Sequence, residues 1–370
     1  MGLEEEIAEI REEIANTPYN KSTEQHLGRL KSKLAEKKEV LERRQSGSGG
    51  GPGYAVEKTG DATVALVGFP SVGKSTLLNA LTNAESEVGD YEFTTLNVQP
   101  GMLQYRGANV QLMDVPGLIE GAAGGRGGGR EVLSVVRTAD LVLFLLSAFE
   151  IDRYERLWNE LYENKVRLDT EPPDVTVSKK GRGGIRITSN IDFGLSEEVV
   201  KEVLREYGIV NADVTIREPI DIDLLIDAVM ENRVYLPSAV AVNKVDLIDP
   251  TYAETVKEEL REHGLDPEEV TFISAEKEKG LDALKERLWE DLRLIRVYMD
   301  KPGRGIDYEE PLVVREGSTV GDAMAKLGGE FERRFRLARV SGPSAKHDQQ
   351  QVGEDHVLAD EDVLKLILRR

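Results

Sequence analysis

The stretch LVGFPSVGKST, from Leu66 to Thr76, constrains the fold more than any other part of the sequence. It continues an apolar, strand-like run that begins at Ala62, and the helix-like run LLNALTNA follows it. The pattern G-x-x-x-x-G-K-S between a strand and a helix is typical of a phosphate-binding loop, whose backbone N–H groups cradle phosphates. We expect Lys74 to reach the β- and γ-phosphate oxygens and the Ser75 hydroxyl to hold Mg²⁺. The predicted loop residues are Gly68, Phe69, Pro70, Ser71, Val72, Gly73, Lys74, Ser75 and Thr76.

Beyond this loop, strand-like runs alternate with amphipathic helices, which is the pattern of a parallel, doubly wound α/β sheet. These runs are ATVALVGF, NVQLMDV, ADLVLFLLSA, SAVAVNKVD and EVTFISAE. The connection from Leu146 to Ser238 is much longer than the roughly 30 residues of a simple βαβ unit, so we expect an insertion there. The insertion has the pattern of a small α/β module, in which EPPDVTVSKKGRGGIRITS is predicted to form a hairpin.

The two ends of the chain have patterns of their own. Residues 1–45 carry two apolar runs at helical spacing, which predicts a helical hairpin, and the stretch SGSGGGPG marks a flexible linker over 46–60. After Leu294, new strand and helix patterns indicate a compact α+β domain at 291–370. The predicted nucleotide-binding domain covers 61–167 and 234–290, and the inserted module covers 168–233.

Two further motifs are expected to surround the phosphates. In NVQLMDVPG, Asp114 ends a strand and can hold Mg²⁺ through water, and Gly117 can turn its N–H toward a γ-phosphate. In YEFTTLNVQPG, a threonine would complete the Mg²⁺ shell only when a γ-phosphate is present, and Thr95 is the candidate, with Thr94 next. The predicted catalytic residues are Lys74, Thr95 and Gly117, and the predicted metal ligands are Ser75, Thr95 and Asp114.

A third motif is expected to recognise the base. SAVAVNKVD places Asn243, Lys244 and Asp246 at the carboxyl end of a strand, where open α/β sheets bind ligands. The Asp246 carboxylate can accept hydrogen bonds from guanine N1–H and its 2-amino group, whereas adenine would leave the charge unpaired. Lys244 would lie along the base, while Ser274 and the Ala275 N–H would complete the pocket beside the guanine carbonyl. The sequence therefore predicts GTP and GDP as ligands and argues against an ATP-dependent kinase.

The composition excludes several other classes of protein. The chain has 370 residues with no cysteine and four histidines, so we expect neither thiolate chemistry nor a cysteine- or histidine-built metal centre. No apolar run approaches the roughly 18 residues of a membrane span and no secretion signal is recognisable, so we expect a cytoplasmic protein without membrane contact. A net charge of −20 argues against DNA binding and is typical of a highly charged surface or a salt-rich cytoplasm.

These motifs together resemble the developmentally regulated GTP-binding (DRG) proteins of the Obg-type GTPase superfamily. The stretches GFPSVGKST, YEFTTLNVQPG, DVPGLIEGAAGGRGGG and NKVD carry the resemblance, which covers essentially the whole chain. The resemblance implies that the N-terminal hairpin is the family's helical domain and that the insertion is a ribosomal-protein-like α/β module. It also implies that residues from about 291 form a TGS domain, a ubiquitin-like β-grasp, and that the protein is linked to ribosomes and translation.

Two positions depart from other GTPases and bear on hydrolysis. Ras-like enzymes carry a water-positioning glutamine where this chain has Leu118, which cannot hydrogen-bond a water, so we expect slow intrinsic hydrolysis. Related GTPases that use K⁺ in place of an arginine finger usually carry an asparagine where this chain has Ser71, so K⁺ stays an open alternative. Arg126 and Arg130 are another source of positive charge, although the surrounding glycines equally suit a mobile switch segment.

Contact with RNA would depend on local basic patches, because the whole chain is acidic. The candidates are the second predicted helix, the group Lys179, Lys180, Arg182 and Arg186, and the group Arg333, Arg334, Arg336 and Arg339. We expect a monomer whose partner is a ribosome or structured RNA, with a regulatory protein as a further candidate. The alternative function is a GTP-responsive protein-docking scaffold in which hydrolysis is incidental.

Overall fold

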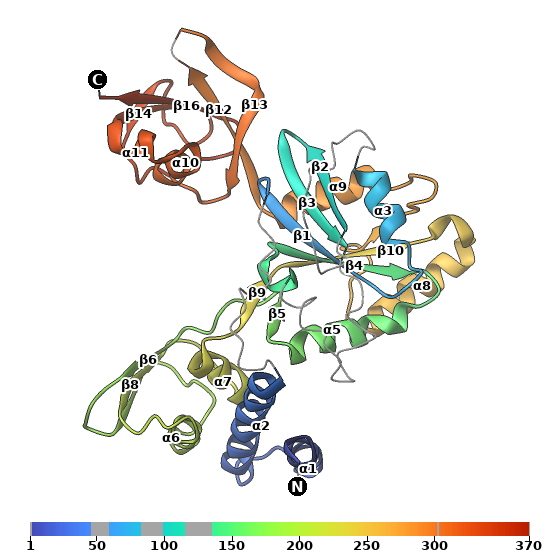
Figure 1. Ribbon diagram of the computed structural model, residues 1–370, viewed down its shortest axis with the longest axis vertical. Helices are drawn as coiled ribbons and strands as arrows, with labels where there is room; N and C mark the ends of the chain where they lie inside the picture. The colour runs from blue at the N-terminus through green and yellow to red at the C-terminus, as the bar shows by residue number, and fades with distance from the viewer. Residues whose placement is uncertain (1, 46–58, 83–98, 115–134, 302, 370) are drawn as a thin grey trace. The chain divides into compact units, whose positions relative to one another are not determined.

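The computed structural model describes residues 2–45, 59–82, 99–114, 135–301 and 303–369 (Figure 1). The chain divides into two compact units. The first contains Met1–Gly53 and Thr170–Tyr235, and the second contains Tyr54–Asp169 and Leu236–Arg370. The N-terminal helices and the insertion therefore belong to the same unit. None of the described helices is long and apolar enough to cross a membrane.

A six-stranded sheet forms the centre of the second unit, with the strand order β11-β10-β4-β1-β3-β2. Its strands are β1 (Ala62–Val67), β2 (Gln99–Tyr105), β3 (Ala108–Asp114), β4 (Leu141–Ser147), β10 (Ser238–Asn243) and β11 (Thr271–Phe272). All neighbours pair in parallel except β2 and β3. Those two pair antiparallel through a tight turn at Arg106 and Gly107, whose φ angles of 51° and 82° suit a two-residue hairpin. The predicted doubly wound α/β fold is confirmed.

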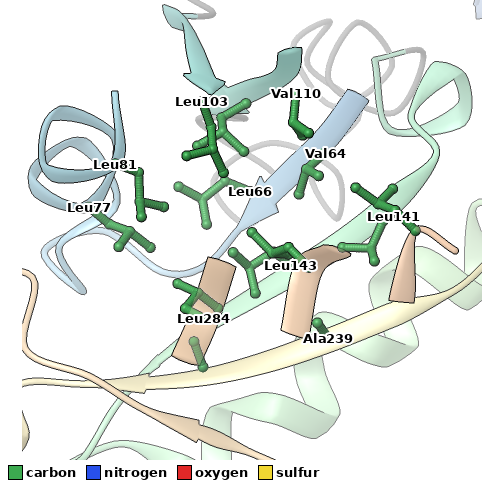
Figure 2. Close-up of a cluster of buried hydrophobic side chains, with 14 of the residues drawn as sticks. Val64, Leu66, Leu77, Leu81, Leu103, Val110, Leu141, Leu143, Ala239 and Leu284 are labelled. Carbon is green, nitrogen blue, oxygen red and sulfur yellow. The ribbon is translucent and has the colours of Figure 1, made fainter. Parts of the chain in front are cut away.

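Helices cover both faces of this sheet, which explains why its central strands β1 and β4 are mostly apolar (Figure 1). The sequence of β4, LVLFLLS, is buried at every position, as expected for a parallel strand covered on both sides. On one face, Leu143 lies in a cluster with Leu77 and Leu284 (Figure 2). On the other, the Phe144 ring lies 5.2 Å from the Tyr154 ring, centroid to centroid. The covering helices are α3 (Lys74–Leu81), α5 (Tyr154–Glu163), α8 (Pro250–Glu262) and α9 (Leu281–Asp291), and the short 3-10 helices are η2 (Ile151–Arg153) and η3 (Val245–Leu247).

The C-terminal part of the second unit has a five-stranded sheet of its own, with the order β13-β12-β16-β14-β15. Only β12 and β16 pair in parallel. Its elements are β12 (Leu294–Lys301), β13 (Gly305–Arg315), α10 (Val320–Leu327), α11 (Gly329–Arg334), β14 (Phe335–Ser341), β15 (Gln350–Val352) and β16 (Asp362–Leu368). Val297, Met324 and Val340 belong to its separate core. This confirms the expected β-rich C-terminal domain with helices.

The first unit combines the two N-terminal helices with the inserted module. Its elements are α1 (Leu3–Asn16), α2 (Glu24–Gln45), β6 (Val175–Lys179), β7 (Ile185–Ser189), α6 (Glu197–Glu206), β8 (Ala212–Ile216) and α7 (Ile222–Met230). Leu27 of α2 lies in one apolar core with Val199 of α6 and Leu225 of α7. The helical hairpin and a small α/β sheet were both expected. The short strand β5 (Val166–Leu168) comes just before the insertion, and β9 (Val234–Leu236) spans its end.

The predicted hairpin within the insertion is wrong, because β6 and β7 are not neighbours. Strand β8 lies between them, antiparallel to β6 and parallel to β7. The inward residues of β8, Ala212, Val214 and Ile216, are completely buried, whereas those of β6 and β7 are only partly buried. The most apolar strand therefore takes the central position, and residues 180–184 cross over its start.

Candidate nucleotide-binding site

The phosphate loop joins the carboxyl end of β1 to the N-terminus of α3, as predicted. Glycine is required at two of its positions. A Cβ on Gly68 would lie 2.5 Å from the Leu145 carbonyl oxygen, and one on Gly73, whose φ is 100°, would lie 2.4 Å from Asn243 Nδ2. Ser71 also has a positive φ, of 63°. The loop thus leads directly into a helix N-terminus, whose unpaired N–H groups favour an anion.

Lys74, the first residue of α3, has its ammonium group over the loop. Its Nζ donates to the carbonyl oxygens of Gly68 at 2.9 Å and Phe69 at 3.2 Å. Burial lowers the pKa of Lys74, and the nearby Asp114 carboxylate acts in the opposite direction. The described residues form no ion pair with this partly buried ammonium group, and a phosphate would supply an anionic partner.

Asp114, at the end of β3, lies beside Ser75, as the predicted metal site requires. The Ser75 hydroxyl donates to Asp114 Oδ2 at 3.3 Å. Burial raises the pKa of Asp114, while Lys74 and Ser75 act in the opposite direction. The other oxygen, Oδ1, is buried without a hydrogen-bond partner in the described part of the chain. A buried carboxylate oxygen without a donor fits Mg²⁺, which prefers oxygen ligands.

Asn243, at the end of β10, connects the phosphate loop to the turn after β11. Its Nδ2 donates to the Val72 carbonyl at 2.8 Å, and its Oδ1 accepts the Ala275 N–H at 2.9 Å. The Ala275 N–H therefore has a protein acceptor, which differs from our expectation that it faces the guanine carbonyl. The difference arises because β10 and β11 are neighbours, so their carboxyl ends come together.

Lys244 supports the same loop from a second point. Its Nζ donates to the Ser71 carbonyl at 2.8 Å, and its own φ is 69°. Sequence reasoning assigned Lys244 and Asn243 to the base alone and missed that both hold the phosphate loop. No pattern in the sequence identifies the two loop carbonyls as their acceptors.

Asp246 lies in η3, next to the turn that carries Ser274. A hydrogen bond from Ser274, with the nearby Lys277 and Lys279, lowers the pKa of Asp246. The Ser274 hydroxyl oxygen also accepts the Lys277 N–H at 3.1 Å, which leaves the hydroxyl hydrogen for the Asp246 carboxylate. The Asp246 carboxylate therefore stays ionised at neutral pH, as recognition of guanine requires.

The structure adds one residue and leaves several others untested. Arg153 of η2 lies with its guanidinium carbon 4.7 Å from the centre of the Phe69 ring, a cation–π contact that the sequence did not predict. The predicted residues Thr95, Thr94, Gly117, Leu118, Arg126 and Arg130 lie outside the described residues.

Three family profiles match consecutive parts of the chain. Residues 63–179 match a family described as "50S ribosome-binding GTPase". Residues 182–294 match the "C-terminal region of MMR_HSR1 domain", and residues 295–368 match the "TGS domain". The first match contains the phosphate loop and Asp114, and the second contains the base-binding motif.

Several relatives match the chain over nearly its full length. It is 68% identical over 370 residues to an uncharacterized GTP-binding protein of Halobacterium salinarum, covering 100% of both chains. It is 44% identical over 376 residues to the developmentally-regulated GTP-binding protein 1 homolog of Dictyostelium discoideum, covering 99% of this chain and 100% of that one. It is 42% identical over 370 residues to developmentally-regulated GTP-binding protein 2 of Mus musculus, with the same coverage. The chain therefore belongs to the DRG family of Obg-type GTP-binding proteins, with a ribosome-binding-type GTPase domain and a C-terminal TGS domain.

Proposed function

We propose that this chain is a Mg²⁺-dependent GTP switch that hydrolyses GTP slowly and acts on ribosomes in the cytoplasm. The observation that carries the proposal is the convergence of three side chains at the ends of β1 and β3. Lys74 lies over the phosphate loop, and Ser75 faces Asp114, one oxygen of which is buried with no donor among the described residues. These groups are suited to a phosphate chain with its cation.

Each residue has a defined part in this proposal. Lys74 would stabilise the negative charge of the β- and γ-phosphates, and Asp246 would select guanine. Ser75 and Asp114, with Thr95 from the segment outside the described residues, would hold Mg²⁺, which supplies charge neutralisation when bound. Thr95 and the Gly117 N–H would close on the γ-phosphate. Hydrolysis would be slow because Leu118 cannot orient a water.

Association with ribosomes is supported by the family description that matches residues 63–179. The N-terminal helices, the inserted module and the TGS domain would recognise the partner, while the nucleotide state would control that recognition. We further propose that the protein acts as a monomer and that a regulatory protein accelerates the slow hydrolysis.

The test measures nucleotide binding and ribosome binding with the same full-length protein. GTP titrations with Mg²⁺ and with EDTA should differ, and Ser75→Ala should lose the Mg²⁺-dependent part of the affinity. Co-sedimentation with ribosomes should then be compared in GDP, in GTP and in a non-hydrolysable GTP analogue. Equal pelleting with every nucleotide would contradict the switch and favour the docking scaffold.

A further inference from the structure

The sheet of the inserted module has one face that no described helix of the first unit covers. Along β6, β8 and β7, alternate residues point into the core with α6 and α7. The others form the opposite face and are polar without exception. They are Thr176, Ser178, Arg186, Thr188, Asp213 and Thr215. The outer-strand members of this set are exposed, and the two on central β8 are half-buried.

The strand register arranges these polar side chains in rows across the sheet. Thr215 of β8 has Thr176 on one side and Thr188 on the other. In the next row, Asp213 lies between Ser178 and Arg186. With strands about 4.8 Å apart, each row spans roughly 10 Å of hydroxyl and charged groups. None of the residues of β6, β7 and β8 is aromatic.

The loop that crosses the start of β8 adds positive charge to this face. Two hydrogen bonds hold the ends of this loop to Asn211, just before β8. The Lys180 N–H donates to the Asn211 carbonyl oxygen at 2.9 Å, and the Gly184 N–H donates to Asn211 Oδ1 at 2.8 Å. The Lys180 ammonium contacts the Asp213 carboxylate. The face carries three cations, Lys180, Arg182 and Arg186, and one carboxylate, Asp213. Its net charge is therefore about +2, against −20 for the whole chain.

Two of the cations on this face are available to an outside partner. Arg182 and Arg186 are exposed, and neither forms an ion pair with the described residues. Lys179 is also exposed, but it pairs with Ala212 and therefore lies on the other face of the sheet. The basic helix α2 differs, because its charges are largely used within the first unit. Lys31 pairs with Asp223 at 2.5 Å, Lys37 with Glu6, and Arg29 with Glu206 at 3.7 Å.

We propose that this hydroxyl-and-basic face, formed by the outward residues of β6, β8 and β7 and by the loop 180–184, binds the backbone of double-helical RNA. Cations and hydroxyl groups suit phosphates and ribose 2′-hydroxyls, through which proteins recognise RNA helices by shape. Binding of single strands usually relies on aromatic side chains for base stacking, and these three strands supply none. The inference rests on the proposed ribosome association and names the surface and the RNA form involved.

The experiment measures binding of the full-length protein to a labelled RNA duplex of about 20 base pairs, since double-stranded RNA-binding domains span about 16. The single strand and the DNA duplex of the same sequence are the comparison probes. One variant removes the two free cations of this face, Arg182→Gln with Arg186→Gln. A second removes hydroxyls, Thr176→Val with Thr188→Val. The matched control removes two cations elsewhere, Lys257→Gln with Arg261→Gln in α8.

We expect the wild type to prefer the RNA duplex to the single strand and the DNA duplex. The cation variant should bind about tenfold more weakly, and the slope of log affinity against log salt concentration should fall by roughly two. The hydroxyl variant should lose affinity for RNA but not for DNA, and the control should match the wild type. Unchanged duplex binding by the cation variant, or preference for the single strand, would overturn the proposal, as would equal competition by polyglutamate.

Thermal unfolding and GTP binding of each variant show whether the fold and the nucleotide site are intact. Ribosome co-sedimentation separates the two proposals. If the wild type binds the RNA duplex through this face but never pellets with ribosomes, the ribosome role fails while the RNA-binding face stands.

Discussion

Replacing Asn243 should destabilise the nucleotide-free protein, because this side chain holds two parts of the backbone together. In Asn243→Ala, the Val72 carbonyl and the Ala275 N–H both lose their partner. Both residues are buried, with 2% and 3% of their surface exposed. An unsatisfied buried group costs about 1–3 kcal/mol, so the expected loss for the two groups is roughly 2–6 kcal/mol unless water enters. That is a large part of a typical stability of about 5–15 kcal/mol.

Tryptophan fluorescence in urea can measure this loss without nucleotide. The chain has two tryptophans, Trp158 and Trp289, and both lie in helices of the nucleotide-binding domain. Asp246→Ala is the matched control, since Asp246 makes no contact with the phosphate loop among the described residues. It should weaken GTP binding and cost the nucleotide-free protein only the hydrogen bond from Ser274, a smaller loss than that in Asn243→Ala. If Asn243→Ala unfolds within about 0.5 kcal/mol of wild type, the typical range for a surface substitution, Asn243 serves the base alone and our reasoning is refuted.

Further predictions concern the base, the phosphates and the cation. Asp246→Asn should shift preference from guanine toward xanthine in a nucleotide titration, because an amide can donate to the 2-oxo group of xanthine. Lys74→Ala should abolish Mg²⁺-dependent GTP binding without unfolding the protein. Asp114→Asn should make the nucleotide-free protein more stable at neutral pH but weaken Mg²⁺-dependent GTP binding. Burial raises the pKa of Asp114, so the ionised carboxylate opposes folding above that pKa. This loss of stability should fade in the wild type as the pH falls through the pKa. Ser71→Asn should fold normally, since asparagine tolerates the φ of 63°, and should gain selective stimulation of hydrolysis by KCl over NaCl. Strong K⁺ selectivity of the wild type would show that Ser71 is not the determinant.

The sequence predicted the fold well where one local pattern decides the structure. The strands β1, β3 and β10 each combine a buried run with a motif at the carboxyl end, so the position of the motif follows from the parallel sheet. The hairpin in the insertion failed because strand order depends on which strand is most buried. The burial of β8 depends on the packing of α6 and α7 against it, which the local sequence does not specify. Similarly, the bonds of Asn243 join residues separated by more than 30 positions, which no local pattern specifies.

The bonds of Asn243 and Lys244 have a consequence for how the site distinguishes nucleotides. Both residues belong to the base-binding motif, yet they hold the Val72 and Ser71 carbonyls of the phosphate loop. A base that displaces the end of β10 would therefore also displace the loop that carries the phosphates. Base recognition and phosphate geometry are then coupled through two short hydrogen bonds rather than added independently. A double-mutant cycle between Asn243→Ala and Lys74→Ala in GDP affinity should show a non-zero coupling energy, whereas the cycle between Asp246→Ala and Lys74→Ala should be close to additive.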